Sequence, residues 1–172
     1  MRALTYYTEV NSGTFTPFLM SAMSDMGYNT PSTTLTSNYS FDSIKSSIDN
    51  NAPVFVEGFE DSYYIGLPFW KWIEWGGVGH AFVCDGYLTQ KRTKTTYIFW
   101  IPCNEVEKND YVHLNIGWGG ASNGWYKSGI FDTNDGYTLD QNINTLTKGK
   151  LNDGNYSNCI RIWTNIKPKT GI

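Results

Sequence analysis

Charged residues are scarce in this chain, and what the sequence lacks excludes several classes of protein. Only 17% of its 172 residues are Asp, Glu, Lys or Arg, and the formal net charge is -3. No cluster of Lys and Arg is large enough to neutralise several phosphates, so we expect no nucleic-acid partner. No apolar run is long enough to span a membrane, and the N-terminus lacks the apolar core of a signal peptide. We therefore expect neither a membrane span nor a signal peptide within this sequence.

Cysteine and histidine are also rare. Three cysteines cannot form a framework of several disulfides, although a single bridge remains open. The two histidines, His80 and His113, are far apart in the sequence and have no clustered thiols or carboxylates around them, which makes a poor set of metal ligands. We therefore expect no metal and no cofactor.

Aromatic residues, by contrast, are abundant. They make up 16% of the chain and include seven Trp and twelve Tyr, and 40% of all residues are hydrophobic. A chain of this length and composition can bury a substantial core. We expect one domain spanning residues 1–172.

Helix signals lie near the N-terminus. Thr16 and Pro17 suit the start of a helix that ends at Gly27, and its apolar stripe would contain Leu19, Ala22, Met23 and Met26. Ser40 suits the cap of a second helix whose Ile44 and Ile48 would face the core.

Strand signals follow the helix signals. Alternating and β-branched residues predict strands at 53–57, 80–87, 95–101, 111–118, 124–127 and 159–166. The basic residues between the second and third of these predict a solvated hairpin loop at Lys91–Lys94, and the Asn- and Gly-rich stretch 132–158 predicts long loops. Helices first and antiparallel strands afterwards indicate an α+β domain built mainly on an antiparallel sheet or half-barrel.

The segment from Gly76 to Tyr87, GGVGHAFVCDGY, contains the first of two informative motifs. Alternation along a strand places His80, Phe82 and Cys84 on one face. The neighbouring glycines, Gly79 among them, have no side chain and would let a substrate backbone approach His80.

The second motif is HLNIGWGGASNGW, from His113 to Trp125. Here His113, Asn115 and Gly117 would share one face of a strand, with Leu114, Ile116 and Trp118 on the other. If the two motifs form adjacent strands, the Asn115 amide oxygen can bond one ring nitrogen of His80. The other nitrogen is then free to take a proton from a thiol. Trp118 would pack over the Asn115 side chain and shield that bond from water.

Together, GHAFVxDGY and HxNxGWGGxSNGW resemble the C-terminal half of the streptopain family, the secreted bacterial cysteine peptidases with a papain-like fold. The order of the other predicted elements agrees over roughly residues 12–168. By this resemblance His80 is the general base, Asn115 orients it, and Trp118 is the shielding aromatic residue. Ile116 stands where many members carry a second tryptophan.

The resemblance also implies a papain-like fold with two or three N-terminal helices, a polypeptide substrate, and a secreted or cell-envelope location. The family's nucleophilic cysteine lies in its N-terminal half, and nothing in this sequence matches it. We therefore expect a partial domain, inactive alone, whose partner would be the missing N-terminal segment.

None of the three cysteines is a good substitute. Cys84 is four residues beyond His80 on the same strand, about 13 Å away at 3.3 Å per residue. Cys159 precedes an apolar run and is expected to be buried. Cys103 is the best of the three, because Pro102 can open a helical turn there, but Glu105 and Glu107 beside it disfavour a thiolate.

A tryptophan-rich segment precedes the first motif, with Trp70, Trp72 and Trp75 at near-alternating positions. These indoles either cover an apolar edge of the sheet or form a wall of a substrate groove.

Three hypotheses for the function remain. One is a cysteine peptidase represented by its histidine-bearing part. Another is a degenerate homologue that binds a peptide or a protein. The third is an aromatic-rich binding module for carbohydrate, because Trp, Tyr and Asn side chains suit sugar faces and hydroxyls.

Overall fold

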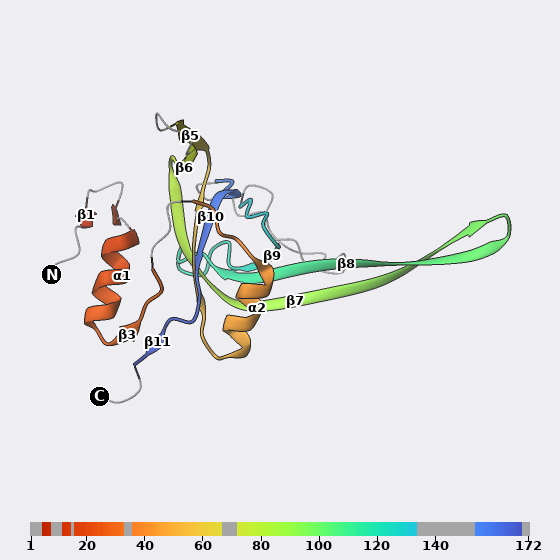
Figure 1. Ribbon diagram of the computed structural model, residues 1–172, viewed down its shortest axis with the longest axis horizontal. Helices are drawn as coiled ribbons and strands as arrows, with labels where there is room; N and C mark the ends of the chain where they lie inside the picture. Colours follow the sequence, from red (N-terminus) through yellow and green to blue (C-terminus); the bar gives the residue numbers. More distant parts are fainter. Residues whose placement is uncertain are drawn as a thin grey trace.

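The structure, a computed structural model, describes residues 5–7, 12–14, 16–32, 36–66, 72–133 and 154–169. Figure 1 shows two helices and a sheet in the body of the molecule, from which one long β-ribbon projects. The elements are β1 (Thr5–Tyr7), β2 (Ser12–Thr14), α1 (Thr16–Asp25), β3 (Tyr28–Asn29), α2 (Phe41–Asp49), β4 (Val54–Phe59), β5 (Ser62–Gly66), β6 (Trp72–Gly76), β7 (Gly79–Ile98), β8 (Ile101–Asn115), β9 (Gly124–Lys127), β10 (Asn158–Trp163) and β11 (Lys167–Pro168).

A five-stranded sheet organises the body. Its strand order is β10-β4-β7-β8-β9, and every neighbouring pair is antiparallel. The main core packs between one face of this sheet and α2, and its fully buried side chains include Ile44, Val54, Val56 and Leu114. The predicted α+β class with a mainly antiparallel sheet is confirmed, and the arrangement is consistent with a papain-like partial domain.

The helices begin for two different reasons. The Ser40 side chain accepts a hydrogen bond from the Ser43 N–H at 3.3 Å, which confirms the predicted N-cap of α2. Thr16, in contrast, is the first residue of α1, and its hydroxyl donates to Glu57 on β4 at 2.7 Å. The apolar stripe of α1 also differs from the prediction, because Met20 is buried whereas Met26 is 67% exposed.

The strands of the ribbon are much longer than the sequence predicts. β7 continues through the basic run to Ile98, so the predicted loop at Lys91–Lys94 is wrong. The turn is instead formed by Phe99 and Trp100, between the register partners Ile98 and Ile101. Opposite charges stabilise the extended pairing, because Arg92 is opposite Glu107 and Lys94 is opposite Glu105.

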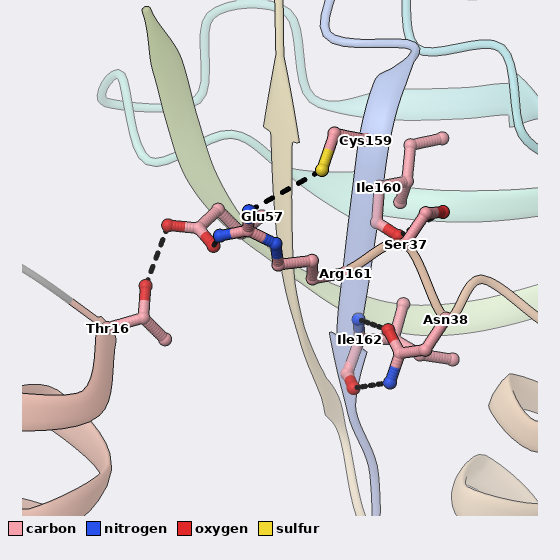
Figure 2. Close-up of polar contacts among 8 residues, drawn as sticks. All are labelled: Thr16, Ser37, Asn38, Glu57, Cys159, Ile160, Arg161 and Ile162. Atoms are coloured by element: carbon pink, nitrogen blue, oxygen red, sulfur yellow. Dashed lines mark hydrogen bonds and ion pairs between the residues drawn. The ribbon is translucent and has the colours of Figure 1, made fainter. Parts of the chain in front are cut away.

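A buried polar network joins α1 to the sheet (Figure 2). The Arg161 guanidinium on β10 lies 3.2 Å from a carboxylate oxygen of Glu57, whose other oxygen accepts the Thr16 hydroxyl. On its other side, Arg161 lies over the ring of Phe59 and within 3.5 Å of the Cys159 sulfur. Beside this network, Asn38 pairs with the backbone of Ile162. These contacts fix the chain preceding α2 against β10 and the start of α1 against β4.

A buried thiol and a partly buried phenol predict that the fold weakens at alkaline pH. Burial raises the pKa of the Cys84 thiol from 9.0 to about 12, and it raises the pKa of Tyr39 from 10.0 to about 12. The unfolded chain therefore loses these protons first. The stabilisation is fully present below about pH 9 and is lost between about pH 9 and 12, by a few kcal/mol.

This loss is measurable by urea unfolding at pH 8 and pH 11. The Cys84→Ala variant is the control, because it lacks the thiol and its pH dependence should be shallower than that of the unmodified chain. Equal free energies of unfolding at the two pH values would contradict the prediction.

Candidate active site

His80 occupies the second position of β7, at the edge of the main core. Phe82 and Cys84 on the same face are buried, while Ala81 and Val83 between them are exposed, which confirms the predicted alternation. His80 itself is half-buried. The imidazole therefore lies where the core meets the surface, which suits a group that must be fixed and still reach a ligand.

One ring nitrogen of His80 is held by the backbone. Nε2 lies 2.8 Å from the carbonyl oxygen of Ile116, on the segment that follows β8. A carbonyl oxygen can only accept, so Nε2 must carry the proton. Nδ1 is then the unprotonated nitrogen of the neutral ring, and no hydrogen bond occupies it within the described residues. The geometry thus prepares Nδ1 to accept a proton.

Asn115 does not contact His80 directly. Its register partner on β7 is Val83, and both side chains lie on the exposed face of the sheet, opposite to the face that holds Phe82 and Cys84. The expected bond between the Asn115 amide and the imidazole is therefore absent. The physical reason is strand pairing: each motif alternates as predicted, but the register puts the two predicted faces on opposite sides of the sheet.

Asn115 nevertheless touches the peptide group that holds His80. Its Oδ1 accepts a hydrogen bond from the Gly117 N–H at 3.1 Å. That N–H belongs to the same peptide unit as the Ile116 carbonyl, and the two groups of a trans peptide point in opposite directions. Asn115 thus bonds one end of the unit and His80 the other, and such chains of hydrogen bonds polarise one another.

A second asparagine fixes the preceding peptide. The Asn123 Oδ1 accepts the Ile116 N–H at 2.8 Å, so Ile116 is held from both sides. Neither Asn123 nor the Ile116 carbonyl was predicted to belong to the site. The SNG tripeptide of the second motif was the available signal for Asn123, whereas a backbone acceptor leaves no signal in side-chain types.

Aromatic rings surround the imidazole. Trp118 lies 4.9 Å from it between ring centroids, Tyr156 lies at 5.6 Å and Phe82 at 6.3 Å. Trp118 therefore packs against the imidazole of His80. Tyr156 comes from the stretch predicted only as loops, and it was missed because a loop position carries no periodicity. These rings exclude water from one side of the imidazole.

The glycines of the two motifs have different roles. A Cβ at Gly79 would lie 2.5 Å from the Phe59 ring and 2.9 Å from the Gly58 carbonyl oxygen. Gly79 therefore makes room for the chain's own neighbours, and the expectation that it admits a substrate backbone is not supported by this packing. Gly117 has open space around it and a φ of +86°, so there the backbone turn itself favours glycine.

None of the three thiols lies where His80 can use it. Cys84 is fully buried, and burial raises its pKa to about 12, so it stays protonated at neutral pH. Cys159 is buried on β10. Cys103 is exposed but belongs to strand β8 rather than to a helical turn, opposite Thr96. Since Thr96 is sixteen residues beyond His80 on β7, the separation along the ribbon is roughly 50 Å.

This distribution of thiols predicts a simple labelling pattern. With an aromatic disulfide reagent, one thiol per folded chain should react at once and two more only after a denaturant is added. Cys103→Ser should remove the fast reaction, because Cys103 is the exposed cysteine. A second fast thiol in the folded Cys103→Ser variant would contradict the burial of Cys84 or Cys159.

The tryptophan-rich segment is only partly described. Trp70 lies outside the described residues, and of Trp72 and Trp75 only the backbone is described, as part of β6 paired with β5. In the described ranges no group of three His, Cys, Asp or Glu side chains is placed to hold a metal. Nor is any helix there long and apolar enough to cross a bilayer.

Comparison with known proteins agrees with the resemblance of the two motifs. A family model described as the Peptidase C10 family matches residues 2–126, which include both His80 and Asn115. No curated protein and no solved structure matches the chain. Because the family match covers well over half of the sequence, the chain belongs to the peptidase C10 family, the streptopain family of cysteine peptidases.

Proposed function

We propose that this chain supplies the general base of a cysteine-peptidase site and that His80 is that base. The observation that carries the proposal is the bond from Nε2 to the Ile116 carbonyl, which leaves Nδ1 as the proton acceptor. Trp118 and Tyr156 support it, because they hold the ring and screen it from water. Asn115 and Gly117 contribute through the peptide unit rather than by direct contact.

The thiolate in this proposal comes from polypeptide outside these 172 residues, either continuous with the chain or separate from it. The support is the position of the chain's own cysteines, two of them buried and the third on the ribbon. On this reading, residues 1–172 form a single partial domain that corresponds to the C-terminal portion of a streptopain-like peptidase, and alone it does not hydrolyse peptides.

The reaction is acyl transfer. The supplied thiol gives its proton to His80 Nδ1, and the thiolate attacks the scissile carbonyl of the substrate. His80 then returns the proton to the leaving amine, and a water activated by the same nitrogen hydrolyses the thioester. Backbone N–H groups near the supplied cysteine hold the oxyanion. Each step needs one ring nitrogen to exchange protons while the other stays bonded, as at His80.

The test is a peptidase assay on two preparations. The 172-residue chain alone should not cleave a fluorogenic peptide, whereas the complete product of the reading frame that contains it should do so, with loss of activity after thiol alkylation. Thiol-dependent cleavage by the chain alone would overturn the external thiolate. A complete product with no further cysteine, and no cleavage by any assembly that contains it, would overturn the peptidase proposal.

A non-catalytic homologue is the second candidate, and the absence of a usable thiol favours it. In that case the fold binds a peptide, a protein or a carbohydrate, with His80 and Asn115 retained without a catalytic role. His80→Ala would then leave ligand affinity almost unchanged and no assembly would show thiol-dependent cleavage.

For the substrate, we propose that the segment with Trp70, Trp72 and Trp75 forms a wall of the groove. The support is its place in the chain, because β6 ends at Gly76, just before β7 and His80. Members of this family are secreted proteins. We extend that location, the bacterial cell exterior or envelope, to this chain, with a polypeptide as its substrate.

A further inference from the structure

The β7–β8 ribbon projects away from the body of the molecule (Figure 1), and it ends in an exposed apolar tip. Phe99 is 91% exposed and Trp100 is 95% exposed, and the residues on either side of them are exposed as well. We define the tip as residues 97–102, whose sequence is YIFWIP. In the described part of the chain these two rings are the most exposed large apolar side chains, and such clusters mark interaction sites.

The tip is apolar on both faces of the ribbon. Ile98 and Ile101 are register partners and share one face, and Tyr97 and Pro102 are partners on the other. A protein groove that takes a ribbon against one face leaves the opposite face in water. Material that surrounds the tip from all sides covers both faces, and the interfacial region of a lipid bilayer does this.

The two residues of the turn are not the ones that stabilise a turn of this type best. Phe99 has a φ of 47° and Trp100 a φ of 68°, as a two-residue turn of type I′ requires. Asn-Gly is the favoured sequence there, and large aromatic residues at positive φ are strained. Two bulky rings are therefore held at the extremity of the ribbon at a conformational cost of order 1 kcal/mol each.

Charged side chains are absent from the tip and begin in the stem of the ribbon. Residues 95–104 contain no charged side chain. The adjacent stem, residues 89–94 and 105–110, carries four cationic residues, Lys91, Arg92, Lys94 and Lys108, and three anionic ones, Glu105, Glu107 and Asp110, so its net charge is +1 although the whole chain is -3. A cationic stem below an apolar tip complements an anionic lipid surface.

The dimensions agree with shallow insertion. From the turn to Tyr97 the ribbon extends about 7–10 Å, similar to the roughly 5–10 Å depth that interfacial segments reach. Deeper insertion is unfavourable, because the outer edges of a two-stranded ribbon carry unpaired N–H and C=O groups that need water or headgroup oxygens. Trp and Tyr are the residues that favour this interfacial layer.

We propose that the tip of the β7–β8 ribbon is an anchor for an anionic phospholipid surface, into which Phe99, Trp100 and the flanking Ile98 and Ile101 insert to the level of the headgroups. This inference does not depend on the proposed peptidase function. It assigns the ribbon to positioning the domain at a membrane surface.

The test is flotation of the 172-residue chain with vesicles of phosphatidylcholine and phosphatidylglycerol in a 7:3 ratio. The chain should bind, and Phe99→Asn/Trp100→Gly should weaken binding at least tenfold. That variant supplies the favoured turn sequence, so it should fold at least as well as the unmodified chain. Met26→Gln/Ile130→Thr is the matched control, because it removes two exposed apolar side chains outside the ribbon and should bind normally.

A fluorophore on Cys103 gives an independent measurement of insertion of the tip. Cys103 is exposed next to the tip, while Cys84 and Cys159 are buried, so the unmodified chain is labelled at one place. An environment-sensitive dye there should shift to the blue with the vesicles. Lys91→Gln/Lys94→Gln should lower binding and its dependence on salt.

Three results would overturn the proposal: no flotation of the unmodified chain, unchanged flotation of Phe99→Asn/Trp100→Gly, or no dye shift. A mass that rises with protein concentration, falls back in the tip variant and is unaffected by vesicles would assign the tip to a second copy of the chain instead.

Discussion

Glu57→Ala is expected to lower the free energy of unfolding by about 3 kcal/mol or more. The carboxylate lies 3.2 Å from Arg161, and both side chains are largely buried, at 16% and 8% exposure. Removal of one partner of a buried ion pair leaves the other charge in a medium that solvates it poorly. The same substitution removes the acceptor of the Thr16 hydroxyl, so α1 loses a contact with the sheet.

Two further variants separate the charge effect from the loss of packing. Glu57→Leu/Arg161→Met replaces both charges by apolar side chains and should recover most of the stability, since such replacements are often neutral. Thr16→Val should cost about 1–2 kcal/mol, because it removes one hydrogen bond to a charged group. Urea unfolding of all four chains gives the comparison. If Glu57→Ala cost less than about 1 kcal/mol, the network would be a weak surface pair.

The body of the fold was largely predictable from the sequence, and the ribbon was not. The Ser40 cap and the alternation of Phe82 and Cys84 depend on local spacing, and both were predicted correctly. The turn was predicted at Lys91–Lys94, because a run of basic residues favours solvent. What keeps that segment extended is the opposite strand with Glu105 and Glu107, and such pairing is decided at long range.

The candidate site was likewise only partly predictable from the sequence. Each motif gave the correct faces of its own strand, but the register that pairs Val83 with Asn115 cannot be read from either motif alone. His80 was identified because its residue type carries chemistry. The group that holds it is the Ile116 carbonyl, and every residue has a carbonyl. Sequence patterns therefore located the base and missed its partner.

His80→Ala should abolish the activity of the thiol-containing assembly, with a fall in kcat of about 10⁴-fold or more. The residue supplies both proton transfers in the proposed reaction, and in the described structure its Nδ1 carries no competing hydrogen bond. Peptide cleavage under single-turnover conditions measures the effect. His80→Gln is the companion variant, because it keeps a donor for the Ile116 carbonyl but has no nitrogen that accepts a proton at neutral pH. A Gln variant with more than about one hundredth of the original activity would contradict the role of His80 as base.

The same assay decides how Asn115 acts. If Asn115 supports His80 through the peptide unit, Asn115→Ala should lower kcat by less than about tenfold, since water can replace its exposed bond to the Gly117 N–H. Asn123→Ala should have the larger effect, because its bond to the Ile116 N–H is shorter and partly buried. A direct bond between Asn115 and the imidazole predicts the opposite order, with a loss of at least 10²-fold for Asn115→Ala, as expected when the ring loses the group that fixes its tautomer. The ranking of these two variants therefore distinguishes a side-chain orienting group from a backbone one without any change to His80.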